Sequence, residues 1–381
     1  MKLVFASDSF KGTLSSRRIA ELLTEAAHTV LGQCETVSLL IADGGEGTAD
    51  AVTEACGGRR EYVTVHDPLM NPIRTYYGVI NGDTAVVEMA LASGLGLVPE
   101  DKRDPLVTTS FGTGELVRAA LENGYRNIVT AIGGSATNDG GMGFAKALGI
   151  RFLDHNRNEL NGKGCDLKSA AHIDMTGLIP EAKNASFTVM CDVANPLCGN
   201  NGATYVYGRQ KGADDEELAR LEAGMINYRD LIIREFDTDP DIIAGAGAAG
   251  GLGTALKVFL NARMKSGIET LLDLTGFDRI IEGADLIVTG EGRLDSQSVN
   301  GKAVCGIGER AKVRGIRAAA LCGCLGEGYE AIFDHGISIV RTTAEDGMEL
   351  SEAMNRAEEL YLKAAIGMFR DLFHIGRDRE P

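Results

Sequence analysis

Short apolar runs alternate with helical repeats at both ends of the chain. The run at residues 2–6 precedes apolar positions at helical spacing from Ile19 to Val30, and a second run covers residues 36–42. Three more runs lie near the C-terminus, at residues 286–289, 316–322 and 337–340. Strands joined by helical crossovers are typical of a parallel sheet. The pattern therefore predicts one parallel α/β domain built from both chain ends.

The middle of the chain has a different pattern. Apolar runs at residues 76–80 and 85–89 flank Asn81, Gly82 and Asp83, a combination typical of a β-hairpin. Further strand-like runs cover residues 127–132 and 187–191 in glycine-rich surroundings. An antiparallel hairpin inside a strand–helix chain indicates a separate mixed-sheet α/β domain. We predict that it is inserted, with residues 1–60 and 281–381 forming the first domain and residues 61–280 the second.

Composition and charge narrow the classes of partner. The 381 residues include 38 Lys and Arg against 54 Asp and Glu, a formal net charge of −16. We therefore expect neither nucleic acids nor anionic membranes as partners, because binding their phosphates needs a basic surface. No C-x-x-C motif, signal-peptide pattern or run of 18 apolar residues is present. We expect a cytoplasmic protein with reduced thiols.

Five polar, glycine-rich segments follow the strand-like runs, which is where α/β sheets bind ligands. They cover residues 8–12, 43–48, 133–143, 245–253 and 289–298. The third lies between a strand and a helix, as a phosphate-binding loop does. Asp43 in the second suits a magnesium ion or a substrate hydroxyl. The fifth, with Lys302 just beyond it, gathers charged side chains around one turn. Asp or Ser before a helix can equally be a simple cap.

The absence of several known catalytic motifs argues against the enzyme classes that use them. The chain lacks the P-loop motif, the G-x-S-x-G nucleophile elbow and the H-E-x-x-H metal motif. Residues 245–253 match G-x-G-x-x-G, but helix packing explains these glycines about as well as a dinucleotide does. Asp192 follows the run at 187–191. It either forms a turn or places a carboxylate beside the third loop. Carboxylates, cations and backbone amides without His or Cys machinery favour phosphoryl transfer.

Nine segments resemble those of the type-1 glycerate kinase family in order and spacing. They are DSFKGTLSS (8–16), ADGGEGT (42–48), RDPLVTTSFGTGEL (103–116), IGGSATNDGGMG (132–143), CDVANPLCGNNGA (191–203), QKGA (210–213), GAGAAGGLG (245–253), KSGIE (265–269) and TGEGRLDSQSVNGK (289–302). The resemblance implies phosphorylation of D-glycerate by ATP at the 2-hydroxyl. It also implies that the discontinuous domain is Rossmann-like or flavodoxin-like.

The resemblance also suggests roles for motif residues. Lys11 and Arg293 would contact the transferred phosphoryl group or the glycerate carboxylate. Asp43 and Asp192 would be the Mg²⁺ ligand and the general base, in either order. The nucleotide phosphates would lie on a cradle of Gly133, Gly134, Ser135, Thr137 and Asn138. The remaining substrate-binding candidates are Asp8, Ser9, Glu291, Asp295, Ser296 and Lys302.

The predicted domains suggest an active site in the cleft between them, where closure would exclude water from the phosphoryl group. Two other functions stay open from the residues alone. The G-x-G-x-x-G match at 245–253 would suit an NAD-linked dehydrogenase, although no histidine lies in a motif loop. A ligand sensor that retained the fold would bind glycerate or ATP without forming ADP.

Overall fold

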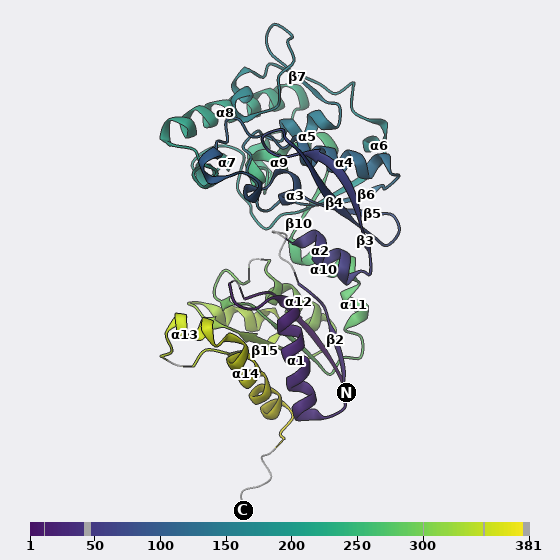
Figure 1. Ribbon diagram of the computed structural model, residues 1–381, viewed down its shortest axis with the longest axis vertical. Coiled ribbons are helices and arrows are strands. Elements are labelled where there is room, and N and C mark those ends of the chain that lie inside the picture. Colours follow the sequence, from purple (N-terminus) through teal and green to yellow (C-terminus); the bar gives the residue numbers. More distant parts are fainter. Residues whose placement is uncertain (11, 42–46, 300, 346, 376–381) are drawn as a thin grey trace, which may run out of the picture. The chain divides into compact units, whose positions relative to one another are not determined.

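The computed structural model describes residues 1–10, 12–41, 47–299, 301–345 and 347–375 (Figure 1). The chain divides into two compact units. The terminal unit comprises residues 1–43 and 267–381, and the inserted unit comprises residues 44–266. The domain boundaries at 60 and 280, and a cleft between the domains, stay predictions from the sequence. No helix in the described residues is long and apolar enough to cross a membrane.

The terminal unit contains a five-stranded, fully parallel sheet. Its strands, in the order of the sheet, are β15 (Ile337–Thr342), β13 (Ala318–Cys322), β11 (Leu286–Gly290), β1 (Lys2–Ser7) and β2 (Glu35–Ser38). Numbered along the chain, this is the flavodoxin-like order 2-1-3-4-5. The predicted Rossmann-like or flavodoxin-like sheet is confirmed. Strand β2 is shorter than the apolar run at 36–42, since Leu39 and Ile41 continue that run as buried residues outside the strand.

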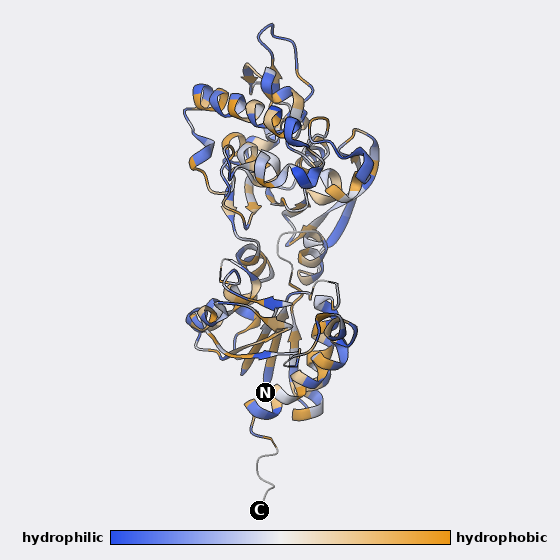
Figure 2. Ribbon diagram, turned by 90° about the vertical axis from the view of Figure 1, so that its left-hand side faces the viewer, coloured by the Kyte–Doolittle hydropathy of each residue, from blue (hydrophilic) through white to orange (hydrophobic). Residues whose placement is uncertain are grey.

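Helices α1 and α14 pack against this sheet through apolar side chains. In α1 (Ser16–Leu31), Ile19 and Leu23 face a core that also contains Phe5 of β1 and Phe369 of α14 (Ala357–Leu372). The central strands β1, β11 and β13 are mostly hydrophobic along their length (Figure 2). The unit's other elements are α10 (Gly267–Thr275), α11 (Phe277–Ile280), β12 (Arg293–Leu294), α12 (Ala303–Val313), β14 (Cys324–Leu325), η6 (Tyr329–His335) and α13 (Leu350–Asn355).

The inserted unit contains a six-stranded mixed sheet. Its strands, in the order of the sheet, are β10 (Arg263–Lys265), β9 (Ser186–Met190), β6 (Asn127–Ala131), β5 (Thr84–Glu88), β4 (Pro72–Ile80) and β3 (Arg59–His66). The first four are mutually parallel, and β4 runs antiparallel to both of its neighbours. Asn81, Gly82 and Asp83 join β4 to β5, with Ile80 paired to Thr84. The predicted hairpin and mixed sheet are confirmed.

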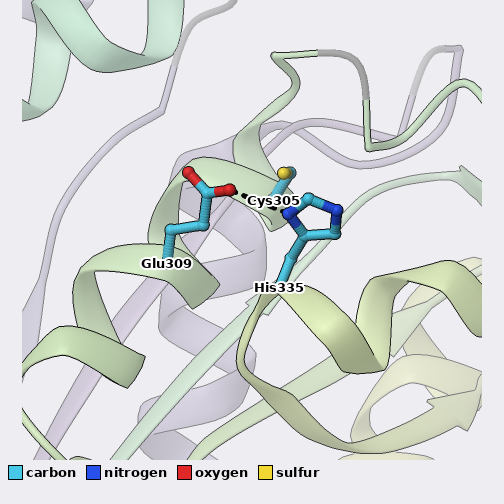
Figure 3. A group of neighbouring side chains, drawn as sticks. All are labelled: Cys305, Glu309 and His335. Carbon is cyan, nitrogen blue, oxygen red and sulfur yellow. Dashed lines mark hydrogen bonds and ion pairs between the residues drawn. The ribbon is translucent and has the colours of Figure 1, made fainter.

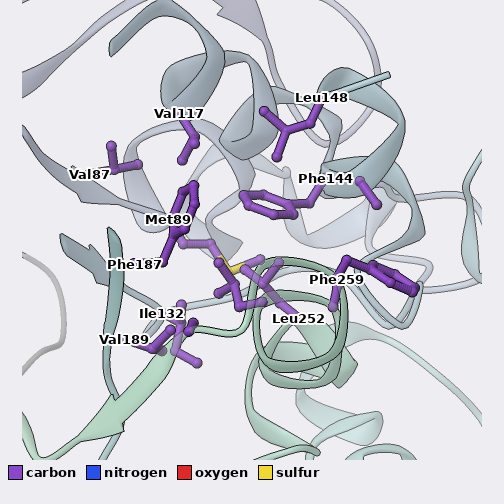
Figure 4. Close-up of a cluster of buried hydrophobic side chains, with 14 of the residues drawn as sticks. Val87, Met89, Val117, Ile132, Phe144, Leu148, Phe187, Val189, Leu252 and Phe259 are labelled. Atoms are coloured by element: carbon purple, nitrogen blue, oxygen red, sulfur yellow. The ribbon is translucent and has the colours of Figure 1, made fainter. Parts of the chain in front are cut away.

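Helices α4, α5 and α9 bury their apolar faces against the inserted unit's sheet. Val117 of α4, Phe144 of α5 and Leu252 of α9 meet strand residues such as Val87 and Val189 in one core (Figure 4). The helices are α2 (Thr48–Ala55), α3 (Ala90–Ser93), α4 (Phe111–Glu122), α5 (Met142–Ala147), α6 (Pro180–Lys183), α7 (Ala203–Tyr207), α8 (Asp215–Phe236) and α9 (Ala248–Leu260). Short elements are η1 (Leu95–Leu97), η2 (Glu100–Lys102), β7 (Arg151–Leu153), η3 (Gly164–Ser169), β8 (His172–Asp174), η4 (Arg209–Lys211) and η5 (Pro240–Ile242).

Candidate active site

The strand order of the terminal unit identifies a ligand-binding position. In a flavodoxin-like sheet the crevice lies at the carboxyl ends of the two central strands where the order reverses. Those strands are β1 and β11, paired in parallel from Leu3 with Leu286 to Ser7 with Gly290. The two following segments stay together, because the Asp8 amide donates to the Gly290 carbonyl at 2.9 Å. Asp8, Ser9 and Glu291 therefore lie at the switch point.

Glu291 is the most enclosed of the predicted substrate-binding side chains. The residue is 9% exposed, and its Oε1 has no hydrogen-bond partner among the described residues. Burial raises the pKa of Glu291; Ser298 and Lys302 act in the opposite direction, and the charges of Asp8 and Asp295 add to the rise. A buried carboxylate oxygen without a partner is costly unless a ligand or cation meets it.

Charged side chains surround Glu291 in the segment after β11. The Lys302 ammonium lies 3.8 Å from Glu291 Oε2, at the start of α12. Arg293 Nε lies 3.4 Å from Asp295 Oδ2, and the Arg293 side chain is 66% exposed. Ser296 is exposed, with its amide bonded to the Glu327 carbonyl at 3.0 Å. The structure thus brings together the predicted charged residues of residues 289–302 and leaves the Arg293 guanidinium accessible.

The remaining predicted residues divide between undescribed positions and the inserted unit. Lys11 and Asp43 lie outside the described residues. Asp192 is exposed and follows β9, whose Met190 pairs with Ala131 of β6. The predicted phosphate cradle at 133–138 follows β6, so Asp192 and the cradle lie at the same edge of the mixed sheet.

The cradle turns most of its side chains into the protein. Thr137 and Asn138 are fully buried, and Asn138 Nδ2 donates to Thr204 Oγ1 at 3.2 Å. Ser135 Oγ accepts from the Thr137 amide at 3.2 Å. Gly134, by contrast, is exposed and has a φ of +75°, in the left-handed region that favours glycine. The cradle therefore presents backbone at its first two positions and uses its later side chains to hold its shape.

Lys211 is a functional candidate to which the sequence analysis assigned no role. It is 2% exposed, and its ammonium donates to Thr137 O at 2.6 Å and to Ser135 Oγ at 3.2 Å. Burial lowers the pKa of Lys211 to about 7, against the opposing effect of Asp139. Its motif QKGA was visible in the sequence, but the contact with the cradle spans more than 70 positions.

Asp139 anchors the far end of the cradle. It is fully buried, and its carboxylate accepts bonds from the amides of Ser110, Gly141 and Gly143 at 2.7, 3.0 and 3.2 Å, and from Ser110 Oγ at 2.7 Å. Burial raises the pKa of Asp139, while these bonds lower it. The carboxylate joins the start of α4 to the start of α5, so its role is to position the loop. Asp before a helix is a cap signal that could have identified it.

Glu88 performs a similar task at the end of β5. Its two carboxylate oxygens accept from the amides of Gly47 and Ala49, both at 2.9 Å. These amides belong to the start of α2, directly after the undescribed residues 42–46. A buried glutamate thereby fixes the C-terminal side of the second glycine-rich segment. The sequence gives no signal for this role, because Glu88 ends an apolar strand with no motif around it.

The glycines of residues 245–253 are packing positions. A Cβ on Gly250 would lie 2.0 Å from Thr137 O, and one on Gly247 would lie 2.1 Å from Pro196 O. Gly250 also has a φ of +67°. The backbone of this run therefore lies directly against the cradle and the segment after Asp192. At these two positions close packing, the alternative to a dinucleotide fingerprint, accounts for the glycines.

Comparisons with known proteins identify similar chains along nearly the whole sequence. The model of the "Glycerate kinase family" matches residues 3–372. The chain is 41% identical over 366 residues to a glycerate 2-kinase from Escherichia coli, covering 96% of each chain. It is 41% identical over 365 residues to a glycerate kinase from Halalkalibacterium halodurans, covering 95% of this chain and 96% of the other.

A solved structure shares the fold. It is described as a putative glycerate kinase 2 from Salmonella typhimurium LT2, is 39% identical and has a TM-score of 0.86. The similarity covers 98% of both chains. The sequence and structural similarities therefore extend through both units and include both sets of strand-end segments.

Proposed function

Since the chain belongs to the glycerate kinase family, and is a kinase that phosphorylates glycerate, we propose that it uses ATP with Mg²⁺. We further propose that it acts on D-glycerate and transfers the phosphoryl group to the 2-hydroxyl. The observation that carries the proposal is the family match over residues 3–372. Named relatives include a glycerate 2-kinase, which supports the 2-hydroxyl as the acceptor.

The charged segment of the terminal unit has the chemistry of a substrate and cation site. Glu291 keeps one buried oxygen without a described partner, and Asp8 and Asp295 act on its pKa. Carboxylate oxygens of this kind fit Mg²⁺, so we propose Glu291 and Asp8 as ligands in the terminal unit beside the predicted Asp43. Asp192 is the predicted ligand in the inserted unit. When bound, Mg²⁺ would neutralise phosphate charge.

The cations of the same segment suit the anionic parts of the substrates. We propose that Arg293 holds the glycerate carboxylate or the transferred phosphoryl group, since an exposed guanidinium can bind such anions through two hydrogen bonds. Lys11 is proposed for the same task. Lys302, together with Asp8, Ser9, Asp295 and Ser296, is proposed to contact glycerate. One of Asp43 and Asp192 would accept the hydroxyl proton.

The cradle of the inserted unit is proposed to bind the nucleotide phosphates. The half-buried Gly133 and the exposed Gly134 present backbone that suits an anion, and Lys211 holds the loop through its bonds to Ser135 Oγ and Thr137 O. Ser135, Thr137 and Asn138 would contribute by holding the loop, because their side chains are buried. A preorganised loop avoids the cost of ordering the backbone when ATP binds.

The test is ADP release from purified protein with D-glycerate and MgATP, with the product identified by phosphorus NMR. Phosphate on the 2-hydroxyl couples to a single carbon-bound proton and gives a doublet, whereas phosphate on the 3-hydroxyl couples to a CH₂ group and gives a triplet. A doublet that requires both Mg²⁺ and glycerate supports the proposal. A triplet would overturn the 2-position, and ligand binding without ADP would favour the sensor alternative.

A further inference from the structure

Three potential metal-ligating side chains meet in the terminal unit, and none of them is proposed for the kinase reaction. Cys305 and Glu309 lie on α12, and His335 is the last residue of η6 (Figure 3). One donor atom from each residue lies within 4.8 Å of the other two. The three side chains point toward one another in Figure 3. We propose that Cys305, Glu309 and His335 form a binding site for a thiophilic divalent cation of the Zn²⁺ type.

The helix explains why two of these ligands share a face. Positions four apart on an α-helix are neighbours on its surface, and Cys305 and Glu309 have this spacing. The third ligand is 26 positions beyond Glu309, yet His335 Nδ1 lies 2.8 Å from Glu309 Oε1. Cys305 Sγ is bonded to the Val299 carbonyl at 3.4 Å, which keeps the thiol at the start of the helix.

The backbone around His335 holds it against α12. A Cβ on Gly308 would lie 2.4 Å from His335 O, so the helix and the end of η6 approach closely only because residue 308 is glycine. The next residue, Gly336, has a φ of +91°, and Lys312 Nζ donates to Asp334 O at 2.8 Å. Two glycines and one lysine bond therefore position the imidazole, and a metal would bind to groups that are already close together.

The donor set distinguishes Zn²⁺ from Mg²⁺. Zn²⁺ accepts sulfur, nitrogen and oxygen ligands, whereas Mg²⁺ prefers oxygen alone. Zinc bond lengths and tetrahedral angles place neighbouring donor atoms roughly 3.3 to 3.7 Å apart. His335 Nδ1 and Glu309 Oε1 are 2.8 Å apart and no pair of the donor atoms is more than 4.8 Å apart. Coordination would therefore move the first pair slightly apart and bring the widest possible pair about 1 Å closer. This cation differs in class from the one proposed for the kinase reaction.

Burial and charge favour a cation with one open coordination position. Cys305 is buried, while the side chains of Glu309 and His335 are 52% and 32% exposed. An ion can therefore reach the site from the solvent side and retain a water molecule as its fourth ligand. Glu269 also lies near Cys305 and adds negative charge, although it is paired to Arg310 at 2.6 Å.

The test uses the full-length protein, freed of metal by a chelator and kept without nucleotide. Zn²⁺ is titrated in competition with a chromophoric chelator, and Co²⁺ is used as a spectroscopic probe. We expect one bound equivalent and a Co²⁺–thiolate absorption band in the near ultraviolet. Cys305→Ser should abolish that band. His335→Gln should weaken Zn²⁺ binding at least about 100-fold, since even loss of an outer-shell partner costs about 10- to 100-fold.

The matched control is Cys165→Ser, which removes an exposed cysteine of the inserted unit and should retain both signals. Each variant's thermal unfolding is measured without metal, to show that it is folded. Zn²⁺ should then raise the unfolding temperature of the wild type and of Cys165→Ser, but not of His335→Gln or Glu309→Gln. Absence of a thiolate band, or equal Zn²⁺ affinity in wild type and His335→Gln, would overturn the site.

Discussion

The two units use their motif residues in opposite ways. In the terminal unit the candidates are charged side chains at strand ends, such as the exposed Arg293 and the partly satisfied Glu291. In the inserted unit, Thr137, Asn138 and Asp139 are fully buried and bonded to the protein. The terminal unit therefore offers side-chain chemistry, whereas the inserted unit, apart from the exposed Asp192, offers a shaped backbone. Substitutions should therefore affect activity in the first unit and stability in the second.

The largest effect on stability is expected from Asp139→Ala. Three buried backbone amides and one hydroxyl lose their acceptor, and each buried polar group left unsatisfied costs about 1–3 kcal/mol. We expect the free energy of unfolding to fall by about 3 kcal/mol or more, as measured by urea denaturation.

The matched control for Asp139 is Asp154→Ala. Asp154 also accepts from two backbone amides, those of Asn156 and Asn158, but in a solvated turn where water can replace it. Asp154→Ala should therefore lower the free energy of unfolding much less than Asp139→Ala does. If the two variants unfold at similar urea concentrations, the buried Asp139 carboxylate does not stabilise the cradle loop.

The next effect is kinetic and belongs to the terminal unit. Glu291→Gln keeps the shape of the side chain but removes the charge proposed to meet a cation or substrate. We expect kcat/KM to fall by about 100-fold, comparable to the loss of one preorganised electrostatic group. Stability should stay equal or rise slightly, since burial of this charge is unfavourable and raises its pKa.

Glu327→Gln, on the nearby exposed turn, is the control and should keep its activity. Steady-state kinetics with glycerate and MgATP measures both variants, and urea denaturation compares their stability. Near-normal turnover in Glu291→Gln would remove this residue from the site, and a large loss of stability would mean that it resembles Asp139 instead.

The last effect is a change in the pH dependence of stability at Lys211. Its pKa is about 7 in the folded state, against 10.5 as the ordinary value. Between these values the unfolded chain binds the extra proton, so wild-type stability rises with pH and is lost as pH falls toward 7. The slope approaches about 1.4 kcal/mol per pH unit. The unfolding free energy of Lys211→Met should lack this dependence on pH.

Urea denaturation from about pH 6 to about pH 10 compares wild type with Lys211→Met, and the exposed Lys168 provides the control variant Lys168→Met. The difference in unfolding free energy between wild type and Lys211→Met should change across this range, while that for Lys168→Met should stay constant. Parallel curves for Lys211→Met would show that Lys211 is charged in the folded protein.

Much of the fold could be predicted because its signals are local. The run at residues 2–6 became β1, and Asn81 and Gly82 formed the predicted hairpin with φ values of +52° and +83°. The strand expected from the run at 36–42 is too long, because buried loop residues such as Ile41 have the same apolar pattern as a strand. The charged residues after β11 were also predictable, since they follow a strand directly.

The sequence by itself determined which segments are strands and helices and which charged residues follow them, because these depend on neighbours within a few positions. Only the tertiary structure decided the flavodoxin-like strand order. It also decided that Lys211 meets the cradle and that His335 meets Glu309. Those contacts depend on how distant backbones approach, at glycines such as Gly308, and that geometry is set by the packing of the whole unit.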